Sequence, residues 1–304
     1  MEEGKMTVFR MLRGRFLTVT SGALAVLAVL LVPVALMAQS RTAEFRDATA
    51  EVDGYTLHYR IGGSGPILLM LHGMTLTGEQ WAPFAKDFTD SYTVVIADLP
   101  GHGGSSPLPD PLSFAKSAKL MHGLLDELGA KQVYGIGHSA GGMTLLHMAA
   151  QQPKRLKAMV LVDAPHYLGP DARKIAREDT WERLDPAVQE WYGKLHPGGQ
   201  TQAQHIFGQY NGLAKTSEHI APEVLKTLSV NTLIVWGDRD PAFPLEIPME
   251  MYRSLPNAAL WVIPQQGHTP LWADMGGDAS AAAAFGKIAK DFLAQEKVSW
   301  GKWF

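Results

Sequence analysis

The chain has 304 residues, with 27 basic and 30 acidic side chains and no cysteine. Its formal net charge of −3 leaves no basic face, so nucleic acid is not an expected partner. The absence of cysteine excludes disulfides, thiolate metal sites and a cysteine nucleophile. The length is sufficient for one large domain or two smaller ones with a buried core.

The first 38 residues differ in composition from the rest of the chain. Four basic residues between positions 5 and 15 precede an apolar run over residues 16–37, and a small residue, Ala38, follows. This order is typical of a cleaved export signal. The apolar run is also close to the roughly 20 residues that span a bilayer, so an uncleaved membrane anchor and a buried structural helix are the alternatives. With a signal or an anchor, the rest of the chain lies outside the cytoplasm, either periplasmic or secreted, or attached to the membrane through residues 16–37.

Strand and helix patterns alternate from residue 51 onward. Asp53-Gly54 is a hairpin turn signal, and residues 39–50 before it predict a linker. The continuous apolar run at 67–71 is typical of a strand buried on both faces of a parallel sheet. We expect the hairpin strands at 51–52 and 55–61, further strands at 92–97, 132–136, 156–162, 232–236 and 259–263, and helices at 79–88, 113–128, 142–150 and 279–294, with Ser113 and Asp278 as N-caps. Strands separated by helices predict an α/β fold with a mostly parallel central sheet and helices on both faces.

The alternation stops between residues 165 and 230, where the sequence is helical and charged without a strand pattern. Asp185-Pro186 predicts the start of one helix, and Pro197-Gly198-Gly199 predicts its end. We expect residues 165–230 to form a helical lid over the carboxyl ends of the strands, where α/β sheets bind ligands. The core domain is then 51–164 together with 231–295, and residues 296–304 are a C-terminal tail. Six aromatic residues either line an apolar pocket or pack the lid onto the core: Tyr167, Trp181, Trp191, Tyr192, Phe207 and Tyr210.

A short glycine-flanked motif, Gly137-His138-Ser139-Ala140-Gly141, lies between the strand pattern at 132–136 and the helix pattern at 142–150. A strand–turn–helix setting is what a G-x-S-x-G nucleophile elbow requires. The turn is so tight that the neighbours of the serine can carry almost no side chain, which gives the two glycines a steric reason to be there. Ser139 is therefore the candidate nucleophile.

Four stretches resemble the α/β-hydrolase superfamily, and the resemblance covers nearly all of residues 50–295. They are Leu71-His72-Gly73-Met74, Asp98-Leu99-Pro100-Gly101-His102-Gly103-Gly104-Ser105, the Ser139 elbow, and Trp236-Gly237-Asp238-Arg239-Asp240 with Gly267-His268. In this superfamily the serine, the acid and the histidine follow one another in that order along the chain. The resemblance implies the α/β-hydrolase fold, and within it the lidded branch with a serine nucleophile that includes esterases and haloperoxidases.

The serine needs a base and an acid at the same edge of the sheet, because a hydroxyl is a poor nucleophile. His268, in the loop after the last strand, is the candidate base. Asp240 is the candidate acid, which holds the imidazole in its useful tautomer. Asp163, at the end of a strand, and Asp238 are the alternative acids.

Two backbone N–H groups are expected to form the oxyanion hole. Ala140 stands at the start of a helix, where amide donors are free and the dipole favours negative charge. Met74 lies in the loop where the superfamily places its second donor. His72 and His102 are expected to shape their loops through local hydrogen bonds, and His138 is expected to pack beneath the elbow.

No cofactor and no metal are expected. The histidines show no spacing such as H-E-x-x-H, and Gly62-Gly63-Ser64-Gly65 precedes a strand rather than joining a strand to a helix. A serine nucleophile implies an acyl-enzyme, and we expect a carboxylesterase for small to medium apolar acyl esters. The alternatives with the same triad are a haloperoxidase or perhydrolase, a lactone hydrolase and a carbon–carbon bond hydrolase. A non-catalytic ligand receptor on this fold is the alternative from another class.

Overall fold

The computed structural model describes residues 44–107, 112–215 and 218–296. Its strands are β1 (Arg46–Val52), β2 (Tyr55–Gly63), β3 (Ile67–Leu71), β4 (Thr93–Ala97), β5 (Val133–His138), β6 (Leu156–Val162), β7 (Asn231–Gly237) and β8 (Ala258–Ile263). Its α-helices are α1 (Ala82–Ala85), α2 (Phe114–Glu127), α3 (Ala140–Gln151), α4 (Pro170–Glu178), α5 (Pro186–Leu195), α6 (Gly199–Leu213), α7 (Pro222–Leu225), α8 (Glu246–Ser254) and α9 (Ala279–Leu293).

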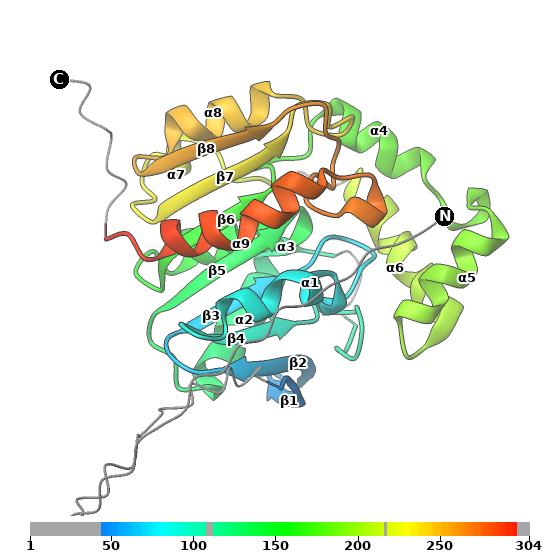
Figure 1. The fold of residues 1–304 in the computed structure, drawn as a ribbon. Helices are drawn as coiled ribbons and strands as arrows, with labels where there is room; N and C mark the ends of the chain where they lie inside the picture. The colour runs from blue at the N-terminus through cyan, green and yellow to red at the C-terminus, as the bar shows by residue number, and fades with distance from the viewer. Residues whose placement is uncertain (1–43, 108–111, 216–217, 297–304) are drawn as a thin grey trace, which may run out of the picture. The chain divides into compact units, whose positions relative to one another are not determined.

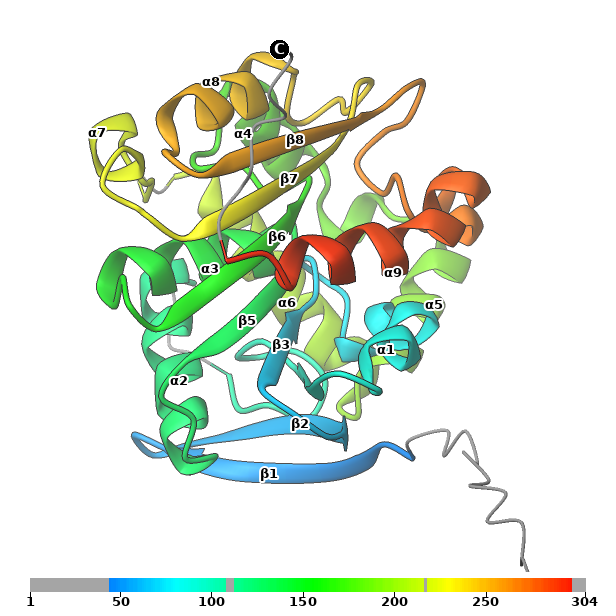
Figure 2. The same ribbon diagram turned by 60° about the vertical axis from the view of Figure 1, so that its left-hand side comes forward.

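The described strands form one sheet in the order β1-β2-β4-β3-β5-β6-β7-β8 (Figure 1). β2 pairs antiparallel with both β1 and β4, and every other pair is parallel. Helices cover both faces, with α2, α3 and α8 on one and α1 and α9 on the other (Figures 1 and 2). The predicted α/β fold with a mostly parallel central sheet is confirmed.

The β1–β2 hairpin turns at Asp53-Gly54, whose φ angles of 51° and 82° are the left-handed values that this turn signal predicts. Its pairing runs from Val52 opposite Tyr55 to Arg46 opposite Ile61. The linker predicted over residues 39–50 is therefore wrong for residues 46–50, which belong to β1. The sequence of β1 does alternate, with Ala48, Ala50 and Val52 more buried than the polar residues between them. Two of these three residues are alanines, which are depleted in strands, so the strand signal is weak.

The continuous helix predicted over residues 79–88 is also wrong. These residues form the 3₁₀ turn Gly78–Trp81, the four-residue α1 and the 3₁₀ turn Lys86–Phe88. Pro83 lies at the start of α1 and has no N–H to donate to the carbonyl four residues earlier, so one α-helical ladder cannot run through this segment.

The predicted helix starts at Ser113, Asp185 and Asp278 are confirmed. Their side chains accept the N–H groups of Lys116 at 3.2 Å, Ala187 at 2.8 Å and Ala281 at 2.7 Å, respectively.

The residues between β6 and β7, called the insertion below, carry α4, α5, α6 and α7. Figure 1 shows α4, α5 and α6 gathered beyond one end of the sheet.

The export signal or anchor predicted over residues 1–38 lies outside the described residues and stays a prediction. The tail predicted over 296–304 lies outside them as well, apart from its first residue. Within the described parts of the chain, no helix is both long enough and apolar enough to cross a membrane.

Candidate active site

Ser139 lies on a sharp turn between β5 and α3. Its φ of 48° and ψ of −116° are strained for a residue with a side chain. A Cβ on Gly137 would lie 2.5 Å from the backbone nitrogen of Gly142, and a Cβ on Gly141 would lie 2.2 Å from the carbonyl oxygen of Leu71. Both flanking positions therefore require glycine, as the elbow motif predicts.

Ser139, His268 and Asp240 form a continuous chain of hydrogen bonds. The Oγ atom of Ser139 lies 2.9 Å from Nε2 of His268, and Nδ1 of His268 lies 2.6 Å from Oδ2 of Asp240. The Asp240 side chain is fully buried and that of His268 is 30% exposed. A carboxylate on Nδ1 selects the tautomer whose Nε2 accepts the serine proton, so the arrangement is able to activate Ser139 as a nucleophile.

The loop after β7 fixes the orientation of Asp240. Its Oδ1 atom accepts the N–H groups of Ala242 at 2.8 Å and Phe243 at 3.1 Å. These two bonds leave Oδ2 for His268. The ring of Phe243 also lies 5.2 Å from the His268 ring, so the same loop limits the position of the imidazole.

Neither alternative acid bonds His268. Asp163 is fully buried, its Oδ1 accepts the N–H of Gly237 at 3.0 Å, and its Oδ2 has no hydrogen-bond partner among the described residues. Burial and, secondly, the charge of Asp240 raise the pKa of Asp163 well above its ordinary value. Asp238 has a buried Oδ1 that is likewise unpartnered within the described chain. Asp163, Asp240 and His268 are the one group of three potential metal ligands in the described residues, with ligand atoms within 4.8 Å of one another.

His138 supports the loop that carries His268. Its Nε2–H donates to the backbone carbonyl of His268 at 2.9 Å, and the amide of Gln80 donates to its Nδ1 at 2.9 Å. Gln80 in turn accepts the N–H of Gly73 at 2.8 Å. Burial lowers the pKa of His138 well below its ordinary value, which suits a neutral structural ring. No sequence pattern had indicated Gln80, because His138 is 58 residues distant along the chain.

The two predicted oxyanion donors, Met74 and Ala140, line the same cavity as Ser139. Ala140 is the first residue of α3, so no carbonyl of the helix accepts its N–H, and the helix dipole favours negative charge there. The N–H of Met74 shares a peptide with the carbonyl of Gly73, which accepts from Nδ1 of His72 at 2.7 Å. Since the C=O and N–H of a trans peptide point in opposite directions, this bond directs the Met74 N–H away from His72.

The cavity has a volume of about 320 Å³ and lies between the carboxyl ends of the strands and the helices of the insertion. Its apolar lining comprises Met74, Phe114, Ala140, Met143, Leu168, Ala172, Ile175, Ala176, Leu184, Val188, Phe207, Leu213, Pro241, Ala242 and Phe243. The ionisable groups are His268, the exposed Asp179, and two tyrosines, Tyr192 and Tyr210, whose phenol pKa values are raised by burial. No lysine or arginine is among the described lining residues.

The aromatic residues of the insertion divide between the two predicted roles. Tyr192, Phe207 and Tyr210 line the cavity. Trp181 packs against Phe207 with ring centroids 5.6 Å apart, and Trp191 is 44% exposed. Several cavity residues from the core, such as Met143 and Phe243, were missed because an apolar side chain does not reveal from sequence whether it faces a cavity or the core.

A sequence model described as the alpha/beta hydrolase fold matches residues 66–196, the segment that holds the Met74 loop and the Ser139 elbow. The chain belongs to the α/β-hydrolase superfamily. A 2-hydroxy-6-oxo-6-phenylhexa-2,4-dienoate hydrolase from Comamonas testosteroni is 25% identical over 293 residues, which cover 85% of this chain and 99% of that protein.

Solved structures of other α/β-hydrolases share the fold. A carboxylesterase from Bacillus subtilis aligns with a TM-score of 0.66 at 20% identity, covering 83% of this chain and 92% of the other. The enol-lactonase from Burkholderia xenovorans LB400 aligns with a TM-score of 0.65 at 22% identity, covering 82% and 100%. Hydrolysis is the general activity that these relatives support, and their names differ in the bond cleaved.

Proposed function

We propose that this α/β-hydrolase cleaves neutral esters of small to medium apolar acyl groups through an acyl-enzyme on Ser139. The Ser139 Oγ attacks the acyl carbon while Nε2 of His268 takes its proton, and the N–H groups of Met74 and Ala140 stabilise the oxyanion. His268 then gives the proton to the leaving alcohol. In the second half it takes a proton from the water that attacks the acyl-enzyme, which releases the acid and restores Ser139.

One observation carries this proposal: the hydrogen-bonded chain from Ser139 through His268 to Asp240 opens into an apolar cavity. A carboxylate that enters such a cavity without a cationic partner costs several kcal/mol in lost hydration. The described lining offers no lysine or arginine, and Asp179 adds a like charge. An uncharged acyl group is therefore the substrate that this lining favours.

Carbon–carbon bond hydrolysis by the same residues is the second candidate, which the sequence likeness to the Comamonas enzyme supports. The name of that enzyme specifies a dienoate, a substrate that carries a carboxylate. The absence of a cationic side chain from the described lining disfavours such a substrate here.

Matched substrates test the proposal. We would compare p-nitrophenyl hexanoate with mono-p-nitrophenyl adipate, which has the same chain length and a terminal carboxylate, using the full chain and its Ser139→Ala variant. We expect kcat/KM for the neutral ester to be at least about tenfold higher, which corresponds to about 1.4 kcal/mol. The Ser139→Ala protein should fold normally and lose nearly all turnover of both esters.

Three results would contradict the proposal. Faster cleavage of a dienoate carbon–carbon bond than of the neutral ester would favour the second candidate. Turnover retained by Ser139→Ala would remove Ser139 from the mechanism. A folded wild-type protein with neither ester turnover nor a fluorophosphonate adduct on Ser139 would favour a ligand receptor.

A further inference from the structure

Three buried histidines outside the proposed triad form a cluster beside the Met74 loop. His72 and His102 lie 5.1 Å apart between ring centroids, and His102 and His196 lie 6.2 Å apart. Their exposed fractions are 0%, 1% and 4%, respectively. Burial is the largest cause of a lowered pKa in all three, so each ring favours its neutral form.

Each ring accepts one backbone N–H and donates to one backbone carbonyl. His72 accepts the N–H of Leu99 at 2.9 Å and donates to the carbonyl of Gly73 at 2.7 Å. The second bond sets the peptide whose other end is the Met74 N–H. Rotation of that peptide would break the bond, so His72 fixes the direction of the proposed oxyanion donor.

The next two peptides of the loop are held by the other two rings. The N–H of Thr75 donates to Nε2 of His102 at 3.2 Å, and the carbonyl of Thr75 accepts from Nε2–H of His196 at 3.2 Å. Thr75 has a φ of 67°, which is unfavourable for a β-branched residue and persists only where its surroundings hold it. The loop Gly73–Thr75 is therefore strained and clamped at three consecutive peptides.

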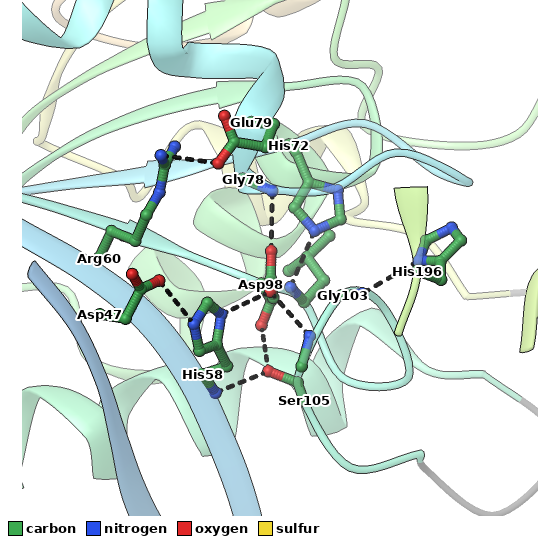
Figure 3. A network of polar contacts seen from close by, with 12 residues as sticks. Asp47, His58, Arg60, His72, Gly78, Glu79, Asp98, Gly103, Ser105 and His196 are labelled. Carbon is green, nitrogen blue, oxygen red and sulfur yellow. Dashed lines mark hydrogen bonds and ion pairs between the residues drawn. The ribbon is translucent and has the colours of Figure 1, made fainter. Parts of the chain in front are cut away.

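His196 differs from the other two rings because it belongs to the insertion. It follows the last residue of α5, and its Nδ1 accepts the N–H of Gly103 at 3.1 Å (Figure 3). One helical turn earlier on α5, Tyr192 lines the same cavity as Thr75. Gln202 of α6 donates to the carbonyls of Gly101 and Gly103, each at 2.9 Å. His196, at the end of α5, thus hydrogen-bonds both the Gly73–Thr75 loop and the loop after β4.

We propose that His196 is a positioning residue of the oxyanion hole. Through its bond to the Thr75 carbonyl, the insertion holds the Gly73–Thr75 loop in the conformation that presents the Met74 N–H to the substrate. The oxyanion hole is complete only while the end of α5 contacts this loop. This inference rests on the proposed function, since it assigns a role within the same reaction.

Two neutral substitutions separate the two bonds of His196. In His196→Gln the side-chain amide reaches the position of Nε2 and keeps a donor for Thr75. In His196→Asn the amide reaches only the position of Nδ1, so the Gly103 bond is kept and the Thr75 bond is lost. Lys194→Gln is the matched control, because Lys194 is exposed on the same helix and pairs with the exposed Glu190 four residues earlier.

The variants would be compared in the full chain by kcat and KM for p-nitrophenyl hexanoate and by hydrogen exchange of peptides that contain Gly73–Thr75. Removing an oxyanion donor costs about 10²–10³ in turnover, and a donor that is displaced rather than removed should cost about 10- to 100-fold. We expect this fall in kcat for His196→Asn, with KM within a few-fold of wild type and faster exchange of the loop. His196→Gln and Lys194→Gln should retain kcat and loop exchange close to wild type.

A rise in KM with unchanged kcat in His196→Asn would overturn the proposal, as would equal losses in His196→Asn and His196→Gln. If the wild-type chain turns over no ester, the proposed function fails, and loop exchange still decides the role of His196. Faster exchange in His196→Asn alone would support the contact between α5 and the loop. Equal exchange in all variants would overturn it.

Discussion

Stability should fall in mild acid because the chain buries neutral histidines, and His102 permits a quantitative test. Burial first, and the nearby His72 second, lower the pKa of His102 from 6.5 to about 3. Between these values the unfolded chain binds a proton on this ring that the folded chain does not bind. The free energy of unfolding therefore decreases as the pH falls below 6.5.

The loss of unfolding free energy can be calculated from the unfolded state alone, because the folded His102 ring stays neutral down to about pH 4. Between pH 8 and pH 5, protonation of a ring with a pKa of 6.5 stabilises the unfolded chain by about 2 kcal/mol. His72, whose pKa is about 4, adds a similar loss. At pH 5 both folded rings are neutral, so their mutual repulsion does not alter the result.

The variant His102→Gln removes the titrating ring and keeps a side-chain acceptor for the Thr75 N–H. Urea unfolding at pH 8 and pH 5 gives the loss of stability for wild type and for the variant. We expect the variant to lose about 2 kcal/mol less than wild type over this range. His205→Gln, an exposed histidine of α6, is the control for removing a histidine without removing a buried ring. Equal pH-dependent losses in wild type and His102→Gln would refute the argument that His102 is buried neutral.

Two further predictions concern the triad and the elbow. Asp240→Asn should lower kcat by about 10³- to 10⁴-fold, because the amide favours the wrong tautomer of the catalytic base. Asp163→Asn should leave kcat near wild type, since a neutral amide replaces a carboxyl that favours its neutral form; equal losses in these two variants would contradict the assignment of Asp240 as the acid. Gly141→Ala should destabilise the fold by about 3 kcal/mol in urea unfolding, because its Cβ meets a backbone oxygen. Gly208→Ala, with open space on α6, should raise the free energy of unfolding by about 0.5–1 kcal/mol. A Gly141→Ala protein no less stable than Gly208→Ala would contradict the close packing of the elbow.

Local signals made much of the fold predictable from sequence. The elbow glycines, the hairpin turn at Asp53-Gly54 and the N-caps each impose a geometric requirement on a few adjacent residues, so each can be recognised without the rest of the chain. The predictions for residues 46–50 and 79–88 failed where this local information was weak. β1 carries only a weak apolar alternation, built mainly on alanines, and is held by its ladder with β2. Pro83 interrupts a segment whose apolar spacing suggested one helix.

The site was predictable in its residue types and less so in its contacts. Asp163 and Asp240 both follow strands at the carboxyl edge of the sheet, so sequence position left both as candidate acids. The bonds from Ala242 and Phe243 orient Asp240, whereas Asp163 turns toward Gly237. His196 was missed for a similar reason. It contacts Thr75 across 121 residues of sequence, and nothing near His196 in the chain marks that contact.

The contacts around Thr75 also bear on how this hydrolase would select substrates. The Gly73–Thr75 loop, which carries the proposed donor of Met74, accepts a hydrogen bond from His196 at the end of α5. The insertion also supplies much of the cavity wall, including Tyr192 on α5. An acyl group too large for the cavity would press on α5 and so disturb the loop that holds the oxyanion donor. Poor fit would then lower kcat as well as raise KM, because the misfit acts on an interaction that the transition state needs more than the ground state does.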